Sequence, residues 1–175
     1  IELAESFSGL DKSILIDTDL RNPHIGIEFG FEQLTPGLTN FISRRCKFSD
    51  AIVREKGSQL SVMPSGPIPN DPLVYLTKPR FGGFIKRIGQ LFERAVIETP
   101  AVNEFGDALV VSKFVDAVVL LCDLEKTEIG DLKDAIQNLQ YAGAPLLGVV
   151  FENSRNIKSR SLKRNNNLVK KVINY

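Results

Sequence analysis

The feature that most constrains the fold is a short apolar run that ends abruptly in charged residues. Residues 14–16, Ile-Leu-Ile, have the length of a strand that is buried on both faces. Asp17, Asp19 and Arg21 follow this run at every second position. In open parallel α/β sheets the carboxyl ends of the strands face the ligand crevice, where a phosphate and its metal ion can bind. The alternative is that the two aspartates shape a turn and the arginine is a surface charge.

Strand-like and helix-like segments alternate along the rest of the chain. Four further β-branched runs are predicted as strands, at residues 60–63, 95–97, 117–122 and 146–151. Helices are expected at 1–9, 38–43, 73–77, 81–92, 106–114 and 128–141, with a helical turn at 49–54 and a loop around Pro23, His24 and Gly26. We therefore predict an α/β fold with a mainly parallel, doubly wound sheet and helices on both faces.

The charge of the chain is distributed unevenly. Residues 154–175 carry seven Lys or Arg and no Asp or Glu, although the whole chain has a net charge of only +1. We expect one folded domain over residues 1–153, followed by a basic C-terminal tail over 154–175. The tail is expected either to be a solvated segment or to attract anionic lipid. Its charge could also attract nucleic acid, which is nevertheless not the expected partner. Single-strand binding in particular is not favoured, because no aromatic residues are interleaved for stacking on bases.

Cysteine usage and hydropathy exclude several classes of protein. Cys46 and Cys122 lie far apart and have no His or Cys partner at zinc-site spacing, so we expect no zinc centre and a reducing, cytoplasmic setting. The lone His24 is expected to be a surface loop residue. No apolar run approaches the roughly 20 residues that span a bilayer. Any membrane role would therefore be peripheral or through a partner.

Polar or loop-forming residues follow every predicted strand. They are Asp17, Pro64, Glu98, Asp123 and the pair Glu152 and Asn153. Parallel strands would bring these residues to one edge of the sheet, where hard oxygen ligands suit a metal ion that bridges phosphates. Each of them alone could equally be a cap or turn residue. Together they favour a nucleotide-type site.

A phosphate-binding loop of the form Gly-x-x-x-x-Gly-Lys-Ser/Thr is not found in these residues. The sequence contains no Gly-Lys pair. Lys12 precedes a strand instead of following one, and Lys126 follows a strand but has no glycines to bring the backbone close to a phosphate. Neither lysine is therefore interpreted as part of such a loop.

Several of these motifs resemble those of the bacterial tyrosine kinases, cytoplasmic P-loop domains that regulate capsule and exopolysaccharide export. The similar segments are 14–23, with Asp-x-Asp-x-Arg, 36–38, 60–72, with a proline-rich Ser-Gly-Pro loop, 92–100, 107–109, 116–121 and 148–150. The similarity covers nearly all of residues 1–153. The related chromosome-partition and septum-site ATPases share the sheet but usually not the Ser-Gly-Pro loop, and they are the alternative, together with a catalytically degenerate scaffold of the kinase family.

The resemblance implies a role for each matching residue. Asp17 and Asp19 would handle the magnesium ion and the attacking hydroxyl, with Arg21 in the same motif. Glu98 stands where the family usually has the aspartate that holds magnesium through water, so the implied metal residues are Asp17, Asp19 and Glu98. Thr99, Pro100, Glu152 and Asn153 complete the implied site for ATP or ADP.

The resemblance also implies partners and a location. It implies a membrane-embedded polysaccharide co-polymerase or adaptor as partner, homo-oligomerisation, and a cytoplasmic domain at the periphery of the inner membrane. In this family the strand before the phosphate loop is central in the sheet. Because these residues contain no phosphate loop, we expect a gap between hydrophobic strands of the sheet, filled by sequence ahead of Ile1 or by another polypeptide. We also expect that the chain alone transfers phosphate inefficiently.

Overall fold

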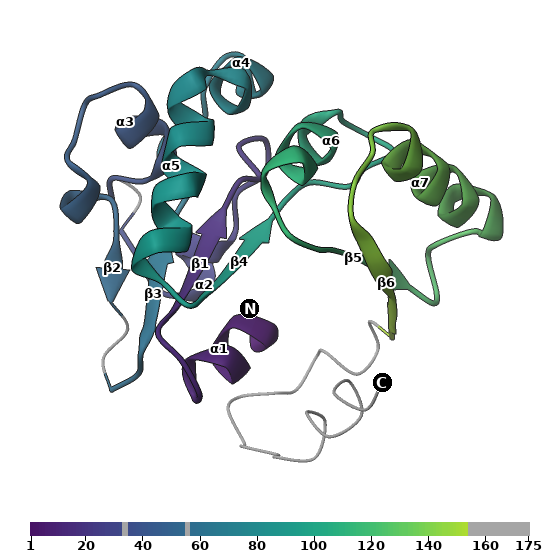
Figure 1. Cartoon of the computed structure of the whole chain (residues 1–175), viewed down its shortest axis with the longest axis horizontal. Helices are drawn as coiled ribbons and strands as arrows, with labels where there is room; N and C mark the ends of the chain where they lie inside the picture. The colour runs from purple at the N-terminus through teal and green to yellow at the C-terminus, as the bar shows by residue number, and fades with distance from the viewer. Residues whose placement is uncertain (33–34, 55–56, 154–175) are drawn as a thin grey trace.

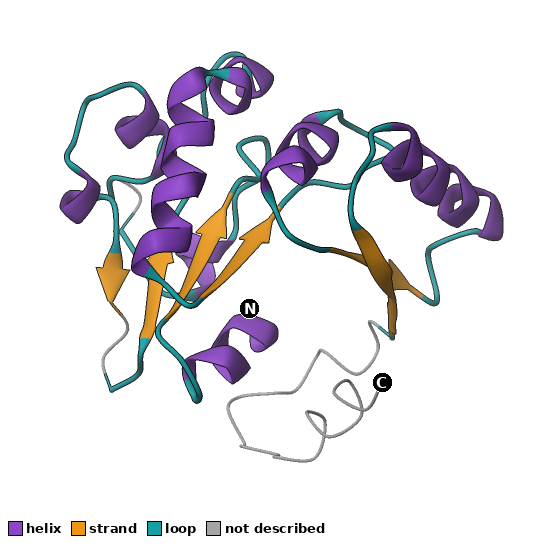
Figure 2. Ribbon diagram, in the orientation of Figure 1, coloured by secondary structure: helices purple, strands orange, loops and turns teal. Residues whose placement is uncertain are grey.

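The computed structural model describes residues 1–32, 35–54 and 57–153, and its elements form two groups around two sheets (Figure 1). The helices are α1 (Glu2–Ser8), α2 (Ile25–Glu28), α3 (Leu38–Ile42), α4 (Pro72–Thr77), α5 (Pro79–Leu91), α6 (Asp107–Val111) and α7 (Ile129–Tyr141), with 3-10 turns η1 (Phe48–Asp50) and η2 (Ser112–Phe114). The strands are β1 (Ser13–Asp17), β2 (Val53–Arg54), β3 (Leu60–Met63), β4 (Arg94–Glu98), β5 (Val118–Asp123) and β6 (Leu146–Glu152). Figure 2 shows the same view by secondary structure.

The larger sheet has the order β2-β3-β1-β4, with β1 parallel to both of its neighbours. All five residues of β1 are buried, as expected for a strand covered on both faces. On one face Ile14 and Ile16 join a core with Phe81 and Phe84 of α5, and on the other Leu15 packs with Ala4 of α1. The predicted α/β class, with helices on both faces of a mainly parallel sheet, is confirmed.

A backbone contact holds the loop before α3 against the loop after β3. The amide of Leu38 donates to the carbonyl of Pro64 at 2.8 Å, and the amide of Thr39 donates to that of Ser65 at 2.9 Å. Between these bonds Gly37 lies so close that a Cβ there would stand 2.2 Å from the Pro64 oxygen. The proline-rich loop is therefore positioned by backbone packing that only glycine at residue 37 allows.

The smaller sheet consists of β5 and β6, which pair in parallel, and α7 accompanies them. Ala135 and Leu139 of α7 are buried, whereas Leu121 of β5 and Leu147 of β6 are 58% and 76% exposed. Within the described residues β4 ends one sheet and β5 ends the other, and the two do not pair. The family resemblance predicts a gap between strands without saying where, and the unpaired edges of β4 and β5 locate it here.

Two local predictions were wrong or incomplete. The predicted helical turn over residues 49–54 is replaced by η1 and then by β2, which pairs antiparallel with β3. The β-branched Val53 pairs with Val62 and extends the sheet edge, a tertiary contact that outweighs the local helical pattern. The loop around Pro23 contains the short helix α2, because Ile25 is buried beside Leu60 and Val62. The predicted tail over 154–175 lies outside the described residues.

Candidate functional site

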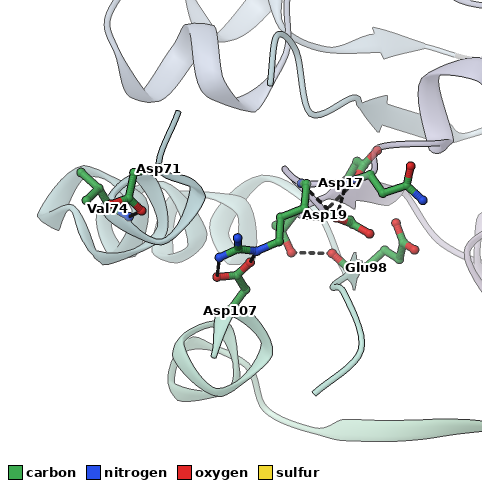
Figure 3. Close-up of polar contacts among 9 residues, drawn as sticks. Asp17, Asp19, Asp71, Val74, Glu98 and Asp107 are labelled. Carbon is green, nitrogen blue, oxygen red and sulfur yellow. Dashed lines mark hydrogen bonds and ion pairs between the residues drawn. The ribbon is translucent and has the colours of Figure 1, made fainter. Parts of the chain in front are cut away.

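Two carboxylates lie side by side where β1 and β4 end. Asp17 is paired in register with Glu98 across the two parallel strands, and Asp17 is fully buried. Oδ1 of Asp17 accepts a hydrogen bond from the amide of Asp19 at 3.0 Å (Figure 3). Oδ2 of Asp17 and Oε2 of Glu98 are buried and have no hydrogen-bond partner in the described structure. Buried carboxylate oxygens are normally satisfied, so this pair is poised to receive a cation or a donor.

Burial, together with repulsion from neighbouring carboxylates, raises the pKa of both groups. Burial, and then the neighbouring Glu98, raise the pKa of Asp17 to about 7. Burial also raises the pKa of Glu98 above its ordinary value, while His24 opposes this shift. Nε2 of His24 lies 3.6 Å from Oε1 of Glu98. A bound divalent cation would favour the ionised form of both carboxylates, because its positive charge attracts them.

Asp19 shapes the turn that follows β1. Its Oδ1 accepts hydrogen bonds from the amides of Arg21 and Asn22 at 3.0 Å and 2.9 Å. Asp19 is therefore a turn residue by its contacts, as the alternative interpretation of the Asp-x-Asp pattern expects, and the turn places it beside the Asp17 and Glu98 pair.

Arg21 is held by Asp107, which lies in one of the segments that resemble the kinase family and for which no site role was predicted. Its Nε and Nη2 donate to the two carboxylate oxygens of Asp107 at 2.6 Å and 3.1 Å. Its guanidinium also lies over the ring of Phe105, 4.0 Å from the ring centroid. Asp107 is fully buried at the start of α6. Arg21 thus ties the turn after β1 to the segment that leads to the second sheet, and its pKa is raised by the hydrogen bond to Asp107.

We expect Asp107→Asn to lower the free energy of unfolding by about 1–3 kcal/mol, because it removes the charge of a buried carboxylate that receives two guanidinium hydrogen bonds. Thermal and denaturant unfolding measure this effect. Asp116→Asn, which removes the same charge from an exposed position after η2, is the control and should change stability little. Equal effects of the two variants would contradict the importance assigned to the Arg21–Asp107 pair.

The other predicted site residues divide between the two sheets. Thr99 and Pro100 follow β4 directly, and the amide of Thr18 donates to the Glu98 carbonyl at 2.9 Å, fixing this edge. Glu152 belongs to β6, where it is paired with Asp123, and Asn153 follows it. The sheet edge therefore unites Asp17, Asp19, Glu98 and Thr99, while Glu152 and Asn153 end the separate sheet.

The residues present fit magnesium in one specific way. No group of three or more His, Cys, Asp or Glu among the described residues is arranged to enclose a metal ion. Magnesium, however, is commonly bound by one or two carboxylates, with phosphate oxygens and water as the remaining ligands. The unsatisfied oxygens of Asp17 and Glu98 match that requirement. They would form the protein side of such a site and would leave most of the coordination to a ligand.

The sheet and the carboxylates at its edge define a class of protein, the P-loop NTPase-like α/β domains. The fold superimposes with a TM-score of 0.84 on the kinase domain of VpsO, at 28% identity over 86% of this chain and 74% of that one. The chimerical protein CapA2B2 gives 0.81 at 29% identity over 85% of this chain and 66% of that chain. The septum site-determining protein MinD of Pyrococcus horikoshii gives 0.64 at 18% identity over 85% of this chain and 60% of that chain, a likeness of fold alone.

Sequence comparison gives the family. The tyrosine-protein kinase CpsD of Streptococcus pneumoniae serotype 4 is 30% identical over 153 residues, which are 86% of this chain and 67% of the relative. CapB of Staphylococcus aureus, a putative tyrosine-protein kinase by name, is 31% identical over 140 residues, 80% of this chain and 61% of the relative. CpsD of Streptococcus agalactiae is 28% identical over 140 residues, again 80% of this chain and 61% of the relative. No protein-family model matches the chain. The chain belongs to the bacterial tyrosine kinase family. It spans about 60% of the length of CapB and of the Streptococcus agalactiae CpsD.

Proposed function

We propose that this chain forms part of an ATP-dependent protein-tyrosine kinase that controls capsule or exopolysaccharide synthesis and export. The observation that carries the proposal is the pair of buried, unsatisfied carboxylate oxygens on Asp17 and Glu98, at the strand ends where the family binds its nucleotide. The names of the relatives support the kinase class. The proposed ligand is ATP or ADP with Mg²⁺.

Each site residue of this chain would have a separate role. Asp17 and Glu98 would contact the magnesium ion, which when bound neutralises charge on the phosphates. Asp19 would accept the proton of the attacking hydroxyl. Arg21 would act as a positioning residue, since both oxygens of Asp107 already receive its N–H groups. Thr99, Pro100, Glu152 and Asn153 would contact the nucleotide when the two sheets are joined.

The proposed site is completed by a strand and phosphate loop that fit between β4 and β5. The support is that each of these strands pairs on one side only in the described residues. An unpaired edge leaves a row of backbone donors and acceptors without strand partners. Val119 and Leu121 of β5 also expose 46% and 58% of their area, which a further element would cover. A parallel strand there would unite the carboxylates of β1 and β4 with the end of β6.

The proposed setting is the cytoplasmic side of the inner membrane, with a membrane-embedded polysaccharide co-polymerase or adaptor as partner. In the part of the chain that the structure describes, no helix has the length and apolar character to cross a membrane. Homo-oligomerisation and binding of the basic tail to anionic lipid belong to the same proposal. They rest on the family resemblance and on the charge of residues 154–175.

A phosphorylation assay tests the kinase proposal. The chain is joined, ahead of Ile1, to the preceding segment of the Staphylococcus aureus CapB relative, and incorporation of phosphate from labelled ATP into tyrosine is measured. The chimaera should incorporate phosphate, and Asp17→Asn should reduce the rate at least about a hundredfold, the scale of removing one essential charge-stabilising group. Asp116→Asn is the control and should leave the rate unchanged. A folded chimaera that binds Mg²⁺ and nucleotide without transferring phosphate would instead identify a catalytically degenerate scaffold.

A further inference from the structure

One side of the larger sheet carries a concentrated positive charge that the proposed kinase site does not use. Arg44, Arg45 and Lys47 lie in the segment between α3 and η1, and Arg80 and Arg87 lie two turns apart on α5. We call these five residues the basic face. Arg44, Arg45, Lys47 and Arg87 are exposed, and Arg80 is half-buried. They belong to elements that pack together beside the sheet, with α3 next to α5 (Figure 1).

Aromatic packing makes this face one continuous surface. The rings of Phe41 and Phe48 both contact Phe84 of α5, with centroids 5.4 Å and 6.3 Å apart. The guanidinium of Arg80 lies 4.4 Å from the centroid of Phe41, and that of Arg87 lies 5.4 Å from the centroid of Phe48. The guanidinium groups of Arg80 and Arg87 therefore lie over aromatic rings that pack on the core. The other three cations belong to the adjoining segment between α3 and η1.

The other end of the described molecule carries an excess of acidic groups. Residues 38–91 contain nine Lys or Arg and three Asp or Glu, whereas residues 92–153 contain four and eleven. Within the second segment, residues 118–152 build β5, α7 and β6 and contain two Lys or Arg and six Asp or Glu. They lie on the opposite side of Figure 1 from α3 and α5. Asp50 is the acidic group on η1 beside the basic face, and its carboxylate accepts from the amide of Lys47 at 3.0 Å. The described molecule thus has a positive end and a negative end.

Nearby aliphatic side chains indicate what kind of anionic partner suits this end. Ile68 in the proline-rich loop is 63% exposed, and Leu73 and Val74 of α4 are 36% and 48% exposed. Helix α4 packs against α5, and Lys78 between the two helices lies over the ring of Tyr75. Basic residues next to exposed aliphatic ones are typical of protein surfaces that lie on anionic membranes. Duplex nucleic acid would use the cations but not the aliphatic side chains.

We propose that the basic face docks on an anionic lipid surface and orients the domain, with the acidic end formed by β5, α7 and β6 directed away from the membrane. This inference is independent of the kinase activity and of the basic tail. Several Lys and Arg held near an anionic surface add their attraction within a Debye length of about 8–10 Å. At that range only the side that faces the membrane counts, so the acidic end does not cancel the attraction.

Vesicle flotation tests the proposal with the full chain. The probe is phosphatidylcholine vesicles with or without phosphatidylglycerol. The test variant carries Arg44→Gln, Arg45→Gln, Lys47→Gln and Arg87→Gln, and it keeps Arg80 because its Nε donates to the Phe41 carbonyl. The matched control carries Arg94→Gln, Lys113→Gln, Lys126→Gln and Lys133→Gln, the four cations of residues 92–153, so that both variants lose the same charge. A third variant carries Lys163→Gln, Arg164→Gln, Lys170→Gln and Lys171→Gln.

We expect salt-sensitive binding to the phosphatidylglycerol vesicles, weakened about tenfold or more by the basic-face variant and little by the control. Thermal unfolding of each variant shows whether a loss of binding reflects a loss of folded protein. If the quadruple variant does not fold, the binding test is repeated with a triple variant that keeps Arg87. Three outcomes would overturn the proposal: no binding to phosphatidylglycerol vesicles, binding that only the third variant abolishes, or tighter binding to duplex DNA than to the vesicles.

Discussion

Replacing Gly37 by alanine should lower the free energy of unfolding by about 3 kcal/mol or more. An added Cβ would lie 2.2 Å from the Pro64 oxygen and 2.3 Å from the Gly66 nitrogen, both of them backbone atoms that cannot rotate away. The loops must separate to make room, which breaks the bonds from Leu38 to Pro64 and from Thr39 to Ser65. Chemical denaturation measures the loss.

Gly83→Ala is the matched control for this prediction. Gly83 lies inside α5, and a Cβ there would meet nothing within 4 Å. Alanine should therefore stabilise the protein, by about 0.5–1 kcal/mol, because it favours the helix over the unfolded chain. Equal midpoints for Gly37→Ala and the wild type would show that the loops are not packed as described. Destabilisation by both variants would point to a general intolerance of added methyl groups.

Asp17→Asn should make the protein more stable at pH 8 by on the order of 3 kcal/mol. The pKa of Asp17 is about 7 in the folded protein against 3.8 ordinarily, so the folded state holds a proton that the unfolded state has already released. Stability from this group is therefore present below about pH 4 and is lost as the pH rises towards 7. Asparagine has no charge to bury and can still accept the hydrogen bond from the Asp19 amide. The two proteins should converge in stability near pH 4.

The same pair of proteins tests the carboxylates as cation ligands. Adding Mg²⁺ at pH 8 should raise the unfolding temperature of the wild type and leave that of Asp17→Asn unchanged, because ligands that bind only the folded state stabilise it. Asp116→Asn is the control and should respond to Mg²⁺ like the wild type.

The stability comparison without Mg²⁺ has its own contradicting outcome. An Asp17→Asn variant that is less stable than the wild type at pH 8 would contradict the assignment of Oδ2 as a buried, unsatisfied atom.

The sequence predicted the strands well because their cause is local. Residues 14–16 form a fully buried strand, which ends at the charged residue Asp17. The runs at 60–63 and 95–97 pair on either side of it. The prediction of a gap between strands rested on the family resemblance, and the topology locates it beside β4. By contrast, β2 and α2 depend on tertiary contacts of Val53 and Ile25, which no local pattern indicates.

The site was predictable only in part. Alternate spacing and strand ends indicated Asp17, Asp19 and Glu98, and the parallel register brings Asp17 and Glu98 together. The same spacing gave no sign of Asp107, which is 86 residues from Arg21 and binds it through the fold. Asp107 lies in the segment 107–109 that resembles the kinase family, but the resemblance implied no role for it, and it also begins an apolar helix. His24 was predicted as a surface loop residue; it is about half exposed, and it also lies 3.6 Å from Glu98, since the loop returns across the end of β4.

Calorimetric titration with ADP and Mg²⁺ tests most directly the claim that the β1 and β4 edge is the carboxylate half of a nucleotide site. It is carried out on this chain and on the chimaera with the preceding CapB segment, after thermal unfolding has shown that both are folded. We expect Mg²⁺-dependent binding of ADP by the chimaera, at least about tenfold weaker binding by its Asp17→Asn variant, and little or none by the chain alone. Absence of ADP binding by both folded proteins, or binding by the chimaera that neither Mg²⁺ nor Asp17 affects, would contradict the claim.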